Sequence, residues 1–529
     1  MEKRFLLIAL LFLVFGCGSE ENEPTDDLPP GNGMEEMDTA PPVVSISGID
    51  GDIEVLTSIN VSIEDASPTV STDIRINGED FFSSNQKEFS FEINPFDFPN
   101  GETLLSIVST DGEGNEREFT RSFNLRKLLV RIAASINANP GEAYFSVNSL
   151  DGNLLAFAEV NESIENVELY ADDDFTPQQI VVTSYILRPN SSRKASLSSI
   201  AQIEPGTDLT VFQEAGGVPT EGTFEGNTLT SSFNVQLTDI PTTQFRNSLF
   251  AIGNNFFTNS RSDFEGPDTT TLNIGFNDET DDVFIYTSDI WAPVSNGPVA
   301  VSDYRYLLLD NLTDQTLSFS ELNSPSSIQE IMVPEGINTI SSRLFGFLDQ
   351  EAFDANNFTF LFDTSSLNDN GADDSIIEIP VIDEYGIIRQ EHTMGMDNGN
   401  TYKASLLGLQ NVPNVPNWNA ARNGNTVSVS GDFDIFTIGF LSAGASNLDW
   451  EYTMPNEASS VLPFDDFQFP DEFITFANEQ GVNLSAFNST SFFSVTFIGS
   501  SEDIEYEDVL FRSQTNIGLG DVLELRSSF

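Results

Sequence analysis

Short stretches in which apolar and polar residues alternate run through most of this chain, and they constrain its fold more than any other feature. Clear examples are residues 44–46, 59–63 and 74–76. A period of two is typical of a strand that has one face in a core and one in solvent. Asn77-Gly78 follows the third example and favours a tight turn, because both residues tolerate positive φ. Helical periodicity is weak, with its best stretch at 472–480, so the sequence predicts an all-β protein.

Residues 43–127 contain about seven such strands with turns every 8–12 residues, which is the pattern of an immunoglobulin-like β-sandwich. Residues 109–115, Ser-Thr-Asp-Gly-Glu-Gly-Asn, precede the last strand near 119–125. This piece resembles the penultimate hairpin of bacterial surface immunoglobulin-like modules. The resemblance implies a module that serves in spacing or adhesion. The fold alone does not specify a function, because β-sandwiches host many functions.

The chain beyond residue 127 remains rich in strand-like stretches, and it has an internal repeat. Three apolar segments that lead to a proline, at 129–136, 233–240 and 402–409, mark the repeat. Two strand-like stretches around an acidic or glycine turn follow each segment, and a further strand comes after them. Since the spacing is irregular, the pattern favours separate domains over a solenoid or propeller. We predict tandem β-sandwich-like domains at 128–225, 226–395 and 396–529.

The first sixteen residues have the pattern of an export signal: a short basic start and an unbroken apolar run at 5–15, then Gly16. The run is shorter than the roughly 20 apolar residues that a bilayer-spanning helix needs. Val14-Phe15-Gly16-Cys17 resembles the lipobox of bacterial lipoproteins. The resemblance implies that Cys17 is lipidated and becomes residue one of the mature chain, anchored in a membrane. The alternative is a plain signal peptide with an incidental cysteine.

Residues 17–42 form an acidic, proline-rich linker between the expected anchor and the first module, because such a segment cannot bury a core. Gly18-Ser19-Glu20-Glu21 resembles the signal that sends lipoproteins of the Bacteroidota to the outer face of the outer membrane. Asp38-Thr39-Ala40 resembles the short O-glycosylation motif of Bacteroidota secreted proteins, with Thr39 as the acceptor. The alternative for both motifs is an ordinary solvated acidic linker.

The charge of the chain excludes several partners. Asp and Glu number 83 against 21 Lys and Arg, and the net charge is −62. Such a body repels nucleic acid and anionic membrane surfaces, whereas it favours divalent cations, cationic partners or a salty habitat. The sequence has one cysteine, so we expect no intrachain disulfide and no thiolate metal site in this extracytoplasmic protein.

Calcium is the metal that the acidic turns favour, since it takes six to eight oxygen ligands. Candidate turns lie at 172–174, 277–282 and 368–374. The last resembles a calcium loop, although it lacks the full spacing and the terminal Glu, and its candidate ligands are Asp369, Asp373 and Asp374. The alternative in each case is a solvated turn, because turns select Asp, Asn and Gly. We expect no other cofactor.

The sequence offers little for catalysis. The single histidine, His392, follows a strand-like run and precedes a turn, so we expect it in a surface loop. A Ser-His-Asp triad would need this residue, and the chain has no Gly-x-Ser-x-Gly elbow. Zinc sites built on His or Cys are excluded by count, and phosphate-binding and dinucleotide motifs are absent from the sequence. We therefore expect no enzyme; a glycoside-active enzyme that uses paired carboxylates is the alternative.

Glycan recognition needs exposed aromatic faces beside hydrogen-bonding side chains. Trp418 lies in a loop rich in Pro and Asn at 411–419, and Trp291 precedes the loop at 295–298. Both are candidate platforms for a sugar ring. Trp450 lies in a strand-like stretch, and we expect it in a core. The alternative for the two loop residues is a Trp that plugs the end of a sandwich.

These features predict a non-enzymatic, surface-exposed lipoprotein that serves in adhesion or ligand binding at the outer membrane. Its expected partners are the membrane, through Cys17, and a polysaccharide or a surface protein. The alternative is a glycan-binding lipoprotein of a polysaccharide-uptake system that uses Trp418 or Trp291. The sequence does not identify the ligand or the oligomeric state.

Overall fold

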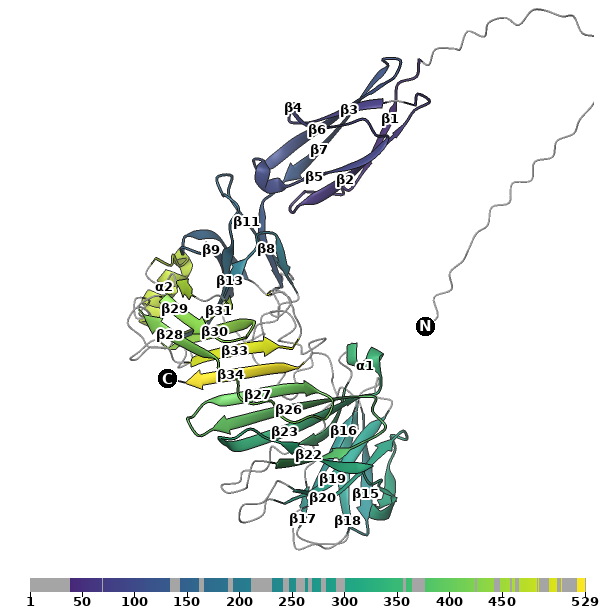
Figure 1. Ribbon diagram of the computed structural model, residues 1–529, viewed down its shortest axis with the longest axis vertical. Helices are drawn as coiled ribbons and strands as arrows, with labels where there is room; N and C mark the ends of the chain where they lie inside the picture. Colours follow the sequence, from purple (N-terminus) through teal and green to yellow (C-terminus); the bar gives the residue numbers. More distant parts are fainter. Residues whose placement is uncertain are drawn as a thin grey trace, which may run out of the picture. The chain divides into compact units, whose positions relative to one another are not determined.

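The computed structural model shows a chain built almost entirely from strands, with two short α-helices among the described residues (Figure 1). None of the described helices has the length and apolar character that membrane crossing requires. The all-β prediction is therefore confirmed. The structure describes residues 39–68, 70–133, 143–160, 166–188, 194–210, 231–240, 247–253, 262–264, 269–276, 282–291, 300–354, 358–363, 376–423, 426–441, 448–456, 459–461, 466–482, 484, 494–501, 506 and 521–528.

The first sandwich has two sheets. One has the order β1-β2-β5 and the other β4-β3-β6-β7. Its strands are β1 (Val43–Ser47), β2 (Thr57–Glu64), β3 (Val70–Ile76), β4 (Glu79–Ser84), β5 (Glu88–Ile93), β6 (Gly101–Asp111) and β7 (Glu116–Leu125). Alternation places Ile59 and Ile74 in the core, where both are fully buried. Asn77 and Gly78 adopt the positive φ that the predicted turn requires.

The described strands form four further sandwiches that repeat this plan. In each of the five sandwiches we count six consecutive strands, which begin at β2, β8, β15, β22 or β29. The first and fourth strands of each count pair in a smaller sheet. The third, second, fifth and sixth strands lie in that order in a larger sheet. This shared order is that of an immunoglobulin-like sandwich, in which two antiparallel sheets pack face to face.

The bounds of these strands follow the chain. Sandwich two has β8 (Leu128–Ala133), β9 (Ala143–Ser149), β10 (Leu154–Val160), β11 (Asn166–Tyr170), β12 (Ile180–Leu187), β13 (Ala195–Ile203) and β14 (Thr207–Leu209). Sandwich three has β15 (Ser231–Thr238), β16 (Asn247–Gly253), β17 (Ser262–Phe264), β18 (Thr269–Phe276), β19 (Val283–Trp291), β20 (Ala300–Leu309) and β21 (Gln315–Ser318).

The remaining two sandwiches also carry the two α-helices. Sandwich four has β22 (Ser327–Met332), β23 (Ile337–Phe347), α1 (Gln350–Asp354), β24 (Thr359–Asp363), β25 (Ile376–Val381), β26 (Ile387–Met396) and β27 (Thr401–Leu407). Sandwich five has β28 (Asn419–Asn423), β29 (Thr426–Ser430), β30 (Ile435–Leu441), β31 (Leu448–Pro455), β32 (Ser459–Val461), α2 (Asp471–Gln480), β33 (Ser494–Ser500) and β34 (Val522–Ser528). Helix α2 lies where the sequence has its best helical stretch, and it ends at Gly481 in the left-handed conformation.

The larger sheets of sandwiches two, five and four join edge to edge into one sheet of twelve strands (Figure 1). Strand β13 of sandwich two pairs in parallel with β31 of sandwich five. Strand β34 of sandwich five pairs antiparallel with β27 of sandwich four. The Nε1–H of the buried Trp450 on β31 donates to Ser199 Oγ on β13 at 2.8 Å. The last sandwich in the chain is therefore the middle part of this sheet.

This topology divides the chain differently from the boundaries that we predicted near residues 226 and 396. The stretch 226–395 spans all of sandwich three and most of sandwich four, and residue 396 ends β26, whose hairpin partner is β27. The reason lies in the burial pattern of two strands. In β22 only Ile331 is buried, so its alternation is weak, whereas β27 alternates along all seven residues. The clear alternation in β27 therefore made residues 402–409 resemble the start of a repeat, and this gave the predicted boundary near 396.

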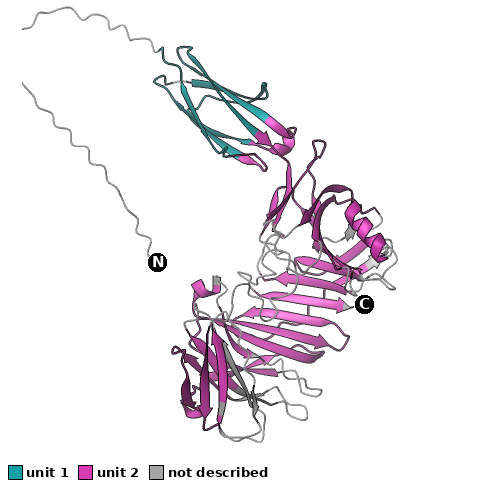
Figure 2. Ribbon diagram, turned by 180° about the vertical axis from the view of Figure 1, so that it is seen from behind, with its two compact units in different colours: residues 1–50, 58–92, 103–123 teal, residues 51–57, 93–102, 124–529 magenta. Residues whose placement is uncertain are grey.

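The chain separates into two compact units, which Figure 2 shows in different colours. Unit 1 holds residues 1–50, 58–92 and 103–123, and unit 2 holds 51–57, 93–102 and 124–529. The two segments 51–57 and 93–102 therefore belong to unit 2, although they lie between or within strands of the first sandwich. The sites below all lie in unit 2.

Candidate ligand-binding groove

The structure describes some of the predicted site residues. Those that lie outside the described residues are Cys17, Asp369, Asp373 and Asp374. Thr39 is exposed. In the acidic turn 172–174, Asp173 accepts a hydrogen bond from the backbone N–H of Asn100 at 2.6 Å. Within the described part of the chain, no three His, Cys, Asp or Glu side chains are grouped as a metal would require. Lipidation, glycosylation and calcium binding stay predictions.

Trp418 packs into the core at one end of sandwich five. Its ring lies 5.9 Å from that of Phe433 and 6.3 Å from that of Phe497, and it is partly buried. Glycines make room for it, because a Cβ at Gly431 would collide with the indole and one at Gly499 would lie 2.9 Å from its Cζ2. These are the contacts of a Trp that plugs the end of a sandwich. Trp291 is the last residue of β19 and pairs with Ala300.

His392 lies in β26, so our expectation of a surface loop was wrong. The side chain is 1% exposed, and its Nδ1 lies 2.8 Å from Ser342 Oγ on the neighbouring strand. Burial lowers the pKa of His392 to about 4, because a charged imidazolium is poorly solvated in the core. His392 and Met394 point to the same face of the strand, and both are buried. This histidine is a core residue that is neutral at pH 7.

A groove of about 590 Å³ lies between β10 and the segment that leads into α2. Small-molecule and cofactor pockets have volumes of roughly 300–1,000 Å³, so this size suits a ligand. The lining is mostly apolar and aromatic, with two carboxylates at the start of α2. Its side chains are Leu154, Phe157, Phe467, Gln468, Phe469, Pro470, Asp471, Glu472, Ile474 and Leu484.

The groove exists because residues 466–470 dock on the β9–β10 turn. Gly152 in that turn has φ +91°, and a Cβ there would lie 2.9 Å from the Phe467 Cα. The backbone N–H of Gln468 donates to Gly152 O at 2.8 Å, and the Asn148 side chain donates to Gln468 O at 2.9 Å. The Gln468 amide oxygen accepts from the N–H of Leu154 at 3.2 Å. Both walls are thus joined by hydrogen bonds across about 310 residues of sequence.

Aromatic rings in edge-to-face and tilted contact support the floor of the groove. Phe467 lies 4.9 Å from Trp450 and 5.0 Å from Phe469, and Phe469 lies 5.3 Å from Phe473. On the opposite wall, Phe157 stacks on Tyr144 at 5.4 Å. Aromatic pairs at these distances add about 0.5–1.5 kcal/mol each beyond their buried area. The groove is therefore supported by packed rings.

The groove has a negative rim and apolar walls. Asp471 and Glu472 are exposed in the first turn of α2, where the helix dipole favours negative charge. Phe157 and Phe469 are half-buried, and Ile474 is 36% exposed. The described lining includes no His, Cys, Ser, Thr, Tyr, Lys or Arg. This lining is suited to apolar groups that lie beside positive charge.

Sequence reasoning missed this groove. Phe467, Phe469 and Phe473 are a visible signal, since they precede or open the helix that the sequence predicts. On the sequence alone, the two loop tryptophans were the candidate aromatic platforms instead. The other wall, β10, comes from a different sandwich, and no local pattern links the two segments.

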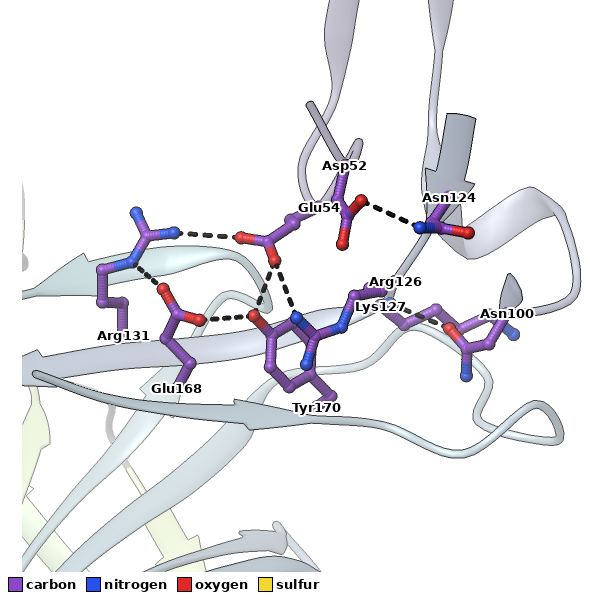
Figure 3. A network of polar contacts seen from close by, with 9 residues as sticks. All are labelled: Asp52, Glu54, Asn100, Asn124, Arg126, Lys127, Arg131, Glu168 and Tyr170. Atoms are coloured by element: carbon purple, nitrogen blue, oxygen red, sulfur yellow. Dashed lines mark hydrogen bonds and ion pairs between the residues drawn. The ribbon is translucent and has the colours of Figure 1, made fainter. Parts of the chain in front are cut away.

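A second polar cluster lies at the start of sandwich two, and it is structural (Figure 3). Glu54 pairs with Arg131 at 3.0 Å and with Arg126 at 3.4 Å, and it accepts from the Tyr170 hydroxyl at 2.6 Å. Glu168 also accepts from Tyr170 and pairs with Arg131. The hydrogen bond from Tyr170 and the pairing with Arg131 lower the pKa of Glu168. The charges neutralise one another, so the cluster ties residues 51–57 to β8 and β11.

Comparisons with known proteins give only remote likenesses. The sequence matches no protein-family model and no curated protein. Among solved structures, the chain is similar to a 1.5-MDa bacterial ice-binding adhesin, with 9% identity and a TM-score of 0.16; the match covers 53% of this chain and 100% of that one. Four tandem repeats from the extending region of a large adhesion protein match with 10% identity, a TM-score of 0.14, and 70% and 99% coverage.

A third likeness is to the SGBP-B protein of the mixed-linkage glucan utilization locus of Bacteroides ovatus, which was solved in complex with a mixed-linkage heptasaccharide. It has 9% identity and a TM-score of 0.15, and it covers 59% of this chain and 84% of that one. At such scores these likenesses carry no argument about function.

Proposed function

We propose that this chain is a non-enzymatic lipoprotein of the outer membrane, exposed at the cell surface, where it binds a ligand or a partner. The aromatic groove between β10 and α2 is the observation that carries the proposal. It has the volume of a ligand pocket, walls joined by hydrogen bonds, and aromatic rings that are partly exposed. Apolar surface of this kind marks binding sites in proteins.

The N-terminal sequence supports the location in this proposal. A lipid on Cys17 would hold the chain at the membrane, and the acidic linker at 17–42 would separate the body from the headgroups. The tandem sandwiches would then present the groove away from the membrane. The lining supports a binding role, because it combines apolar rings with the volume of a ligand pocket.

A glycan is the second candidate ligand, and the aromatic walls favour it. Sugar rings stack on aromatic faces, and Phe157 and Phe469 line opposite walls of the groove. These two phenylalanines are therefore a further candidate platform beside Trp291, whereas Trp418 is packed against Phe433 and Phe497.

Two experiments test the proposed function. Trypsin added to intact cells should digest the body of the wild-type chain, and Cys17→Ala should release the protein from the membrane fraction. Full protection of the body from trypsin would contradict surface exposure.

Binding is tested with the full chain downstream of Cys17, on a glycan array and with a phage library of random peptides. We expect at least one probe class to be retained by the wild type and lost from the double variant Phe157→Ala, Phe469→Ala. Phe82→Ala, at a 41% exposed phenylalanine of unit 1, is the matched control and should retain the probe. Equal retention by the double variant would show that the groove is not the binding site.

A further inference from the structure

We infer that the occupant of this groove is an extended, basic peptide segment of a partner protein, which adds as a strand to the edge of β10. The inference rests on the proposed function and names the class of ligand. Three features of the groove carry it: the open strand edge in one wall, the spacing of its apolar side chains and the charge of its rim.

The first feature is the edge. Strand β10 is the end strand of the twelve-stranded sheet, and no described strand pairs with its outer side. An edge strand presents a row of backbone donors and acceptors that an extended chain can pair with. Gln468 already accepts from the N–H of Leu154, so the remaining edge begins after that residue. Strand addition here would extend the sheet alongside the aromatic wall.

The second feature is the apolar lining. Leu154 and Phe157 of β10 line the groove together with Phe469 and Ile474. In strand addition the backbone supplies affinity, and pockets for alternate side chains supply specificity. A chain paired with β10 would direct every second side chain to one face, so apolar residues at alternate positions would meet this lining.

The third feature is charge. Asp471 and Glu472 are exposed at the rim, and Glu159 is exposed on β10 itself. Asp151 is exposed in the adjacent β9–β10 turn. No Lys or Arg is among the described lining residues. A segment with Lys or Arg between its apolar residues would complement this rim, and an acidic segment would be repelled.

The polar groups of the same lining suit a glycan poorly, although its aromatic rings offer stacking surfaces. Sugar hydroxyls require many hydrogen-bonding side chains, but Gln468 uses its amide oxygen on Leu154 and its amide nitrogen on Asn153. Pro470 has no backbone donor. Asp471 and Glu472 are then the remaining polar side chains of the lining, and both are acceptors when ionised. A peptide brings its own backbone donors, so it fits these groups better.

Synthetic octapeptides test this inference on the full chain downstream of Cys17. The probe is fluorescent (Lys-Val)4, and the comparison peptides are (Glu-Val)4 and (Lys-Val)4 with alternate N-methylation in either register. We expect (Lys-Val)4 to bind at least tenfold more tightly than (Glu-Val)4. N-methylation in one register should weaken binding at least tenfold, because it removes the donors that pair with β10.

Variants of the chain locate the site. Phe469→Ala, and the pair Asp471→Lys with Glu472→Lys, should each weaken (Lys-Val)4 at least tenfold. Glu479→Lys, on an exposed position of α2 outside the groove, should change Kd by less than twofold. If Phe469→Ala lowers the melting temperature markedly, Phe469→Leu provides the same test with the packing retained.

The outcomes separate this inference from the proposed function. Equal binding of the two peptides, or insensitivity to N-methylation in both registers, overturns strand addition of a basic segment. A glycan that is retained by the wild type and lost from Phe469→Ala also overturns it, while the proposed binding role stands. If no probe distinguishes wild type from the groove variants, both proposals fail.

Discussion

At the scale of single residues, burial decides the roles of His392 and Trp418. His392 lies on β26 between Ser342 of β23 and Ala404 of β27, and its Nε2 has no hydrogen-bond partner among the described residues. Its local sequence is polar, Gln-Glu-His-Thr, which gave no sign of a core position. Pairing with strands on both sides removed the ring from water. A residue's neighbours in the sheet, not its neighbours in sequence, set its charge state.

His392 makes the stability of the fold depend on pH. Its pKa is about 4 in the fold and about 6.5 in an unfolded chain, so the unfolded state takes up the proton first as the pH falls. Its contribution is full above about pH 6.5 and decreases toward pH 4, by up to about 3 kcal/mol in the free energy of unfolding. Urea unfolding at about pH 7 and pH 4 should show a smaller pH effect in His392→Gln than in wild type.

Glu391, beside His392, is present both in wild type and in His392→Gln. Burial raises its pKa, although Arg389 and other basic neighbours oppose the shift, so its contribution to stability changes in the opposite direction with pH. The difference between wild type and variant therefore isolates His392. An identical pH dependence in the two proteins would contradict a neutral, buried imidazole.

Trp418→Ala should act on stability and leave groove binding unchanged. The indole fills space between Gly431, Gly499 and the rings of Phe433 and Phe497, so its removal leaves a cavity. We expect a loss of about 3 kcal/mol in the free energy of unfolding, at the low end for aromatic-to-alanine substitutions because the residue is partly exposed. Thermal unfolding and peptide binding measure the two effects. Unchanged stability with loss of glycan retention would restore the platform hypothesis.

At the scale of elements, side-chain bonds join segments that alternation alone would leave unconnected. Arg126 lies over the Tyr170 ring at 3.6 Å, and Glu54 and Glu168 both accept from that tyrosine's hydroxyl (Figure 3). Asp208 of β14 completes the group around Arg131 at 3.6 Å. Strands β8, β11 and β14 are all short, so this cluster supplies stability that their backbone pairing does not.

Glu54→Gln should loosen this cluster. The variant keeps the side-chain volume but removes the negative charge shared by two arginines, and Glu54 is only 17% exposed. We expect a loss of about 1–2 kcal/mol, less than for a fully buried pair because the arginines are partly exposed to solvent. Hydrogen exchange should become faster in β8 and β11, and the difference from wild type should shrink in high salt. Glu64→Gln, at an exposed glutamate of unit 1, should leave exchange in those strands unchanged.

At the scale of unit 2, sandwich five joins the larger sheets of sandwiches two and four into one long sheet. Its edge strands β31 and β34 pair with β13 and β27, which lie about 200 residues apart in sequence. Lys403 of β27 pairs with Glu524 of β34 at 3.0 Å, and Ser196 of β13 bonds Asp449 at 2.9 Å. Sandwich five thus covers two edges that would otherwise be open.

Removal of residues 419–529 should therefore promote self-association. The truncated chain keeps β13 and β27 but exposes an edge on each, and unpaired edges template pairing with other chains. Size-exclusion chromatography with light scattering measures the number of chains in each particle. At the same concentration, this number should be larger for the truncated chain than for the full protein. Circular dichroism serves as the control for retained β-structure. A folded truncated chain that associates no more than the full protein would contradict this role.

Local sequence patterns were enough to predict the class of the fold and much of its local structure. Period-two alternation predicted the strands of the first sandwich, Asn77-Gly78 predicted its turn, and the helix at 472–480 was found nearly to its bounds. Trp450 was expected in a core and is 1% exposed. These properties depend on residues close together in the chain, because alternation and turn preference act over a few residues.

Strand pairing and the place of the groove became visible only in three dimensions. Alternation shows which face of a strand is buried but does not name its partner, so the place of sandwich five between sandwiches two and four was not readable. The groove combines Phe157 with Phe469, which the sequence separates by two sandwiches. For the same reason, the sequence wrongly placed His392 in a surface loop and left two alternatives open for Trp418. Burial is set by long-range packing.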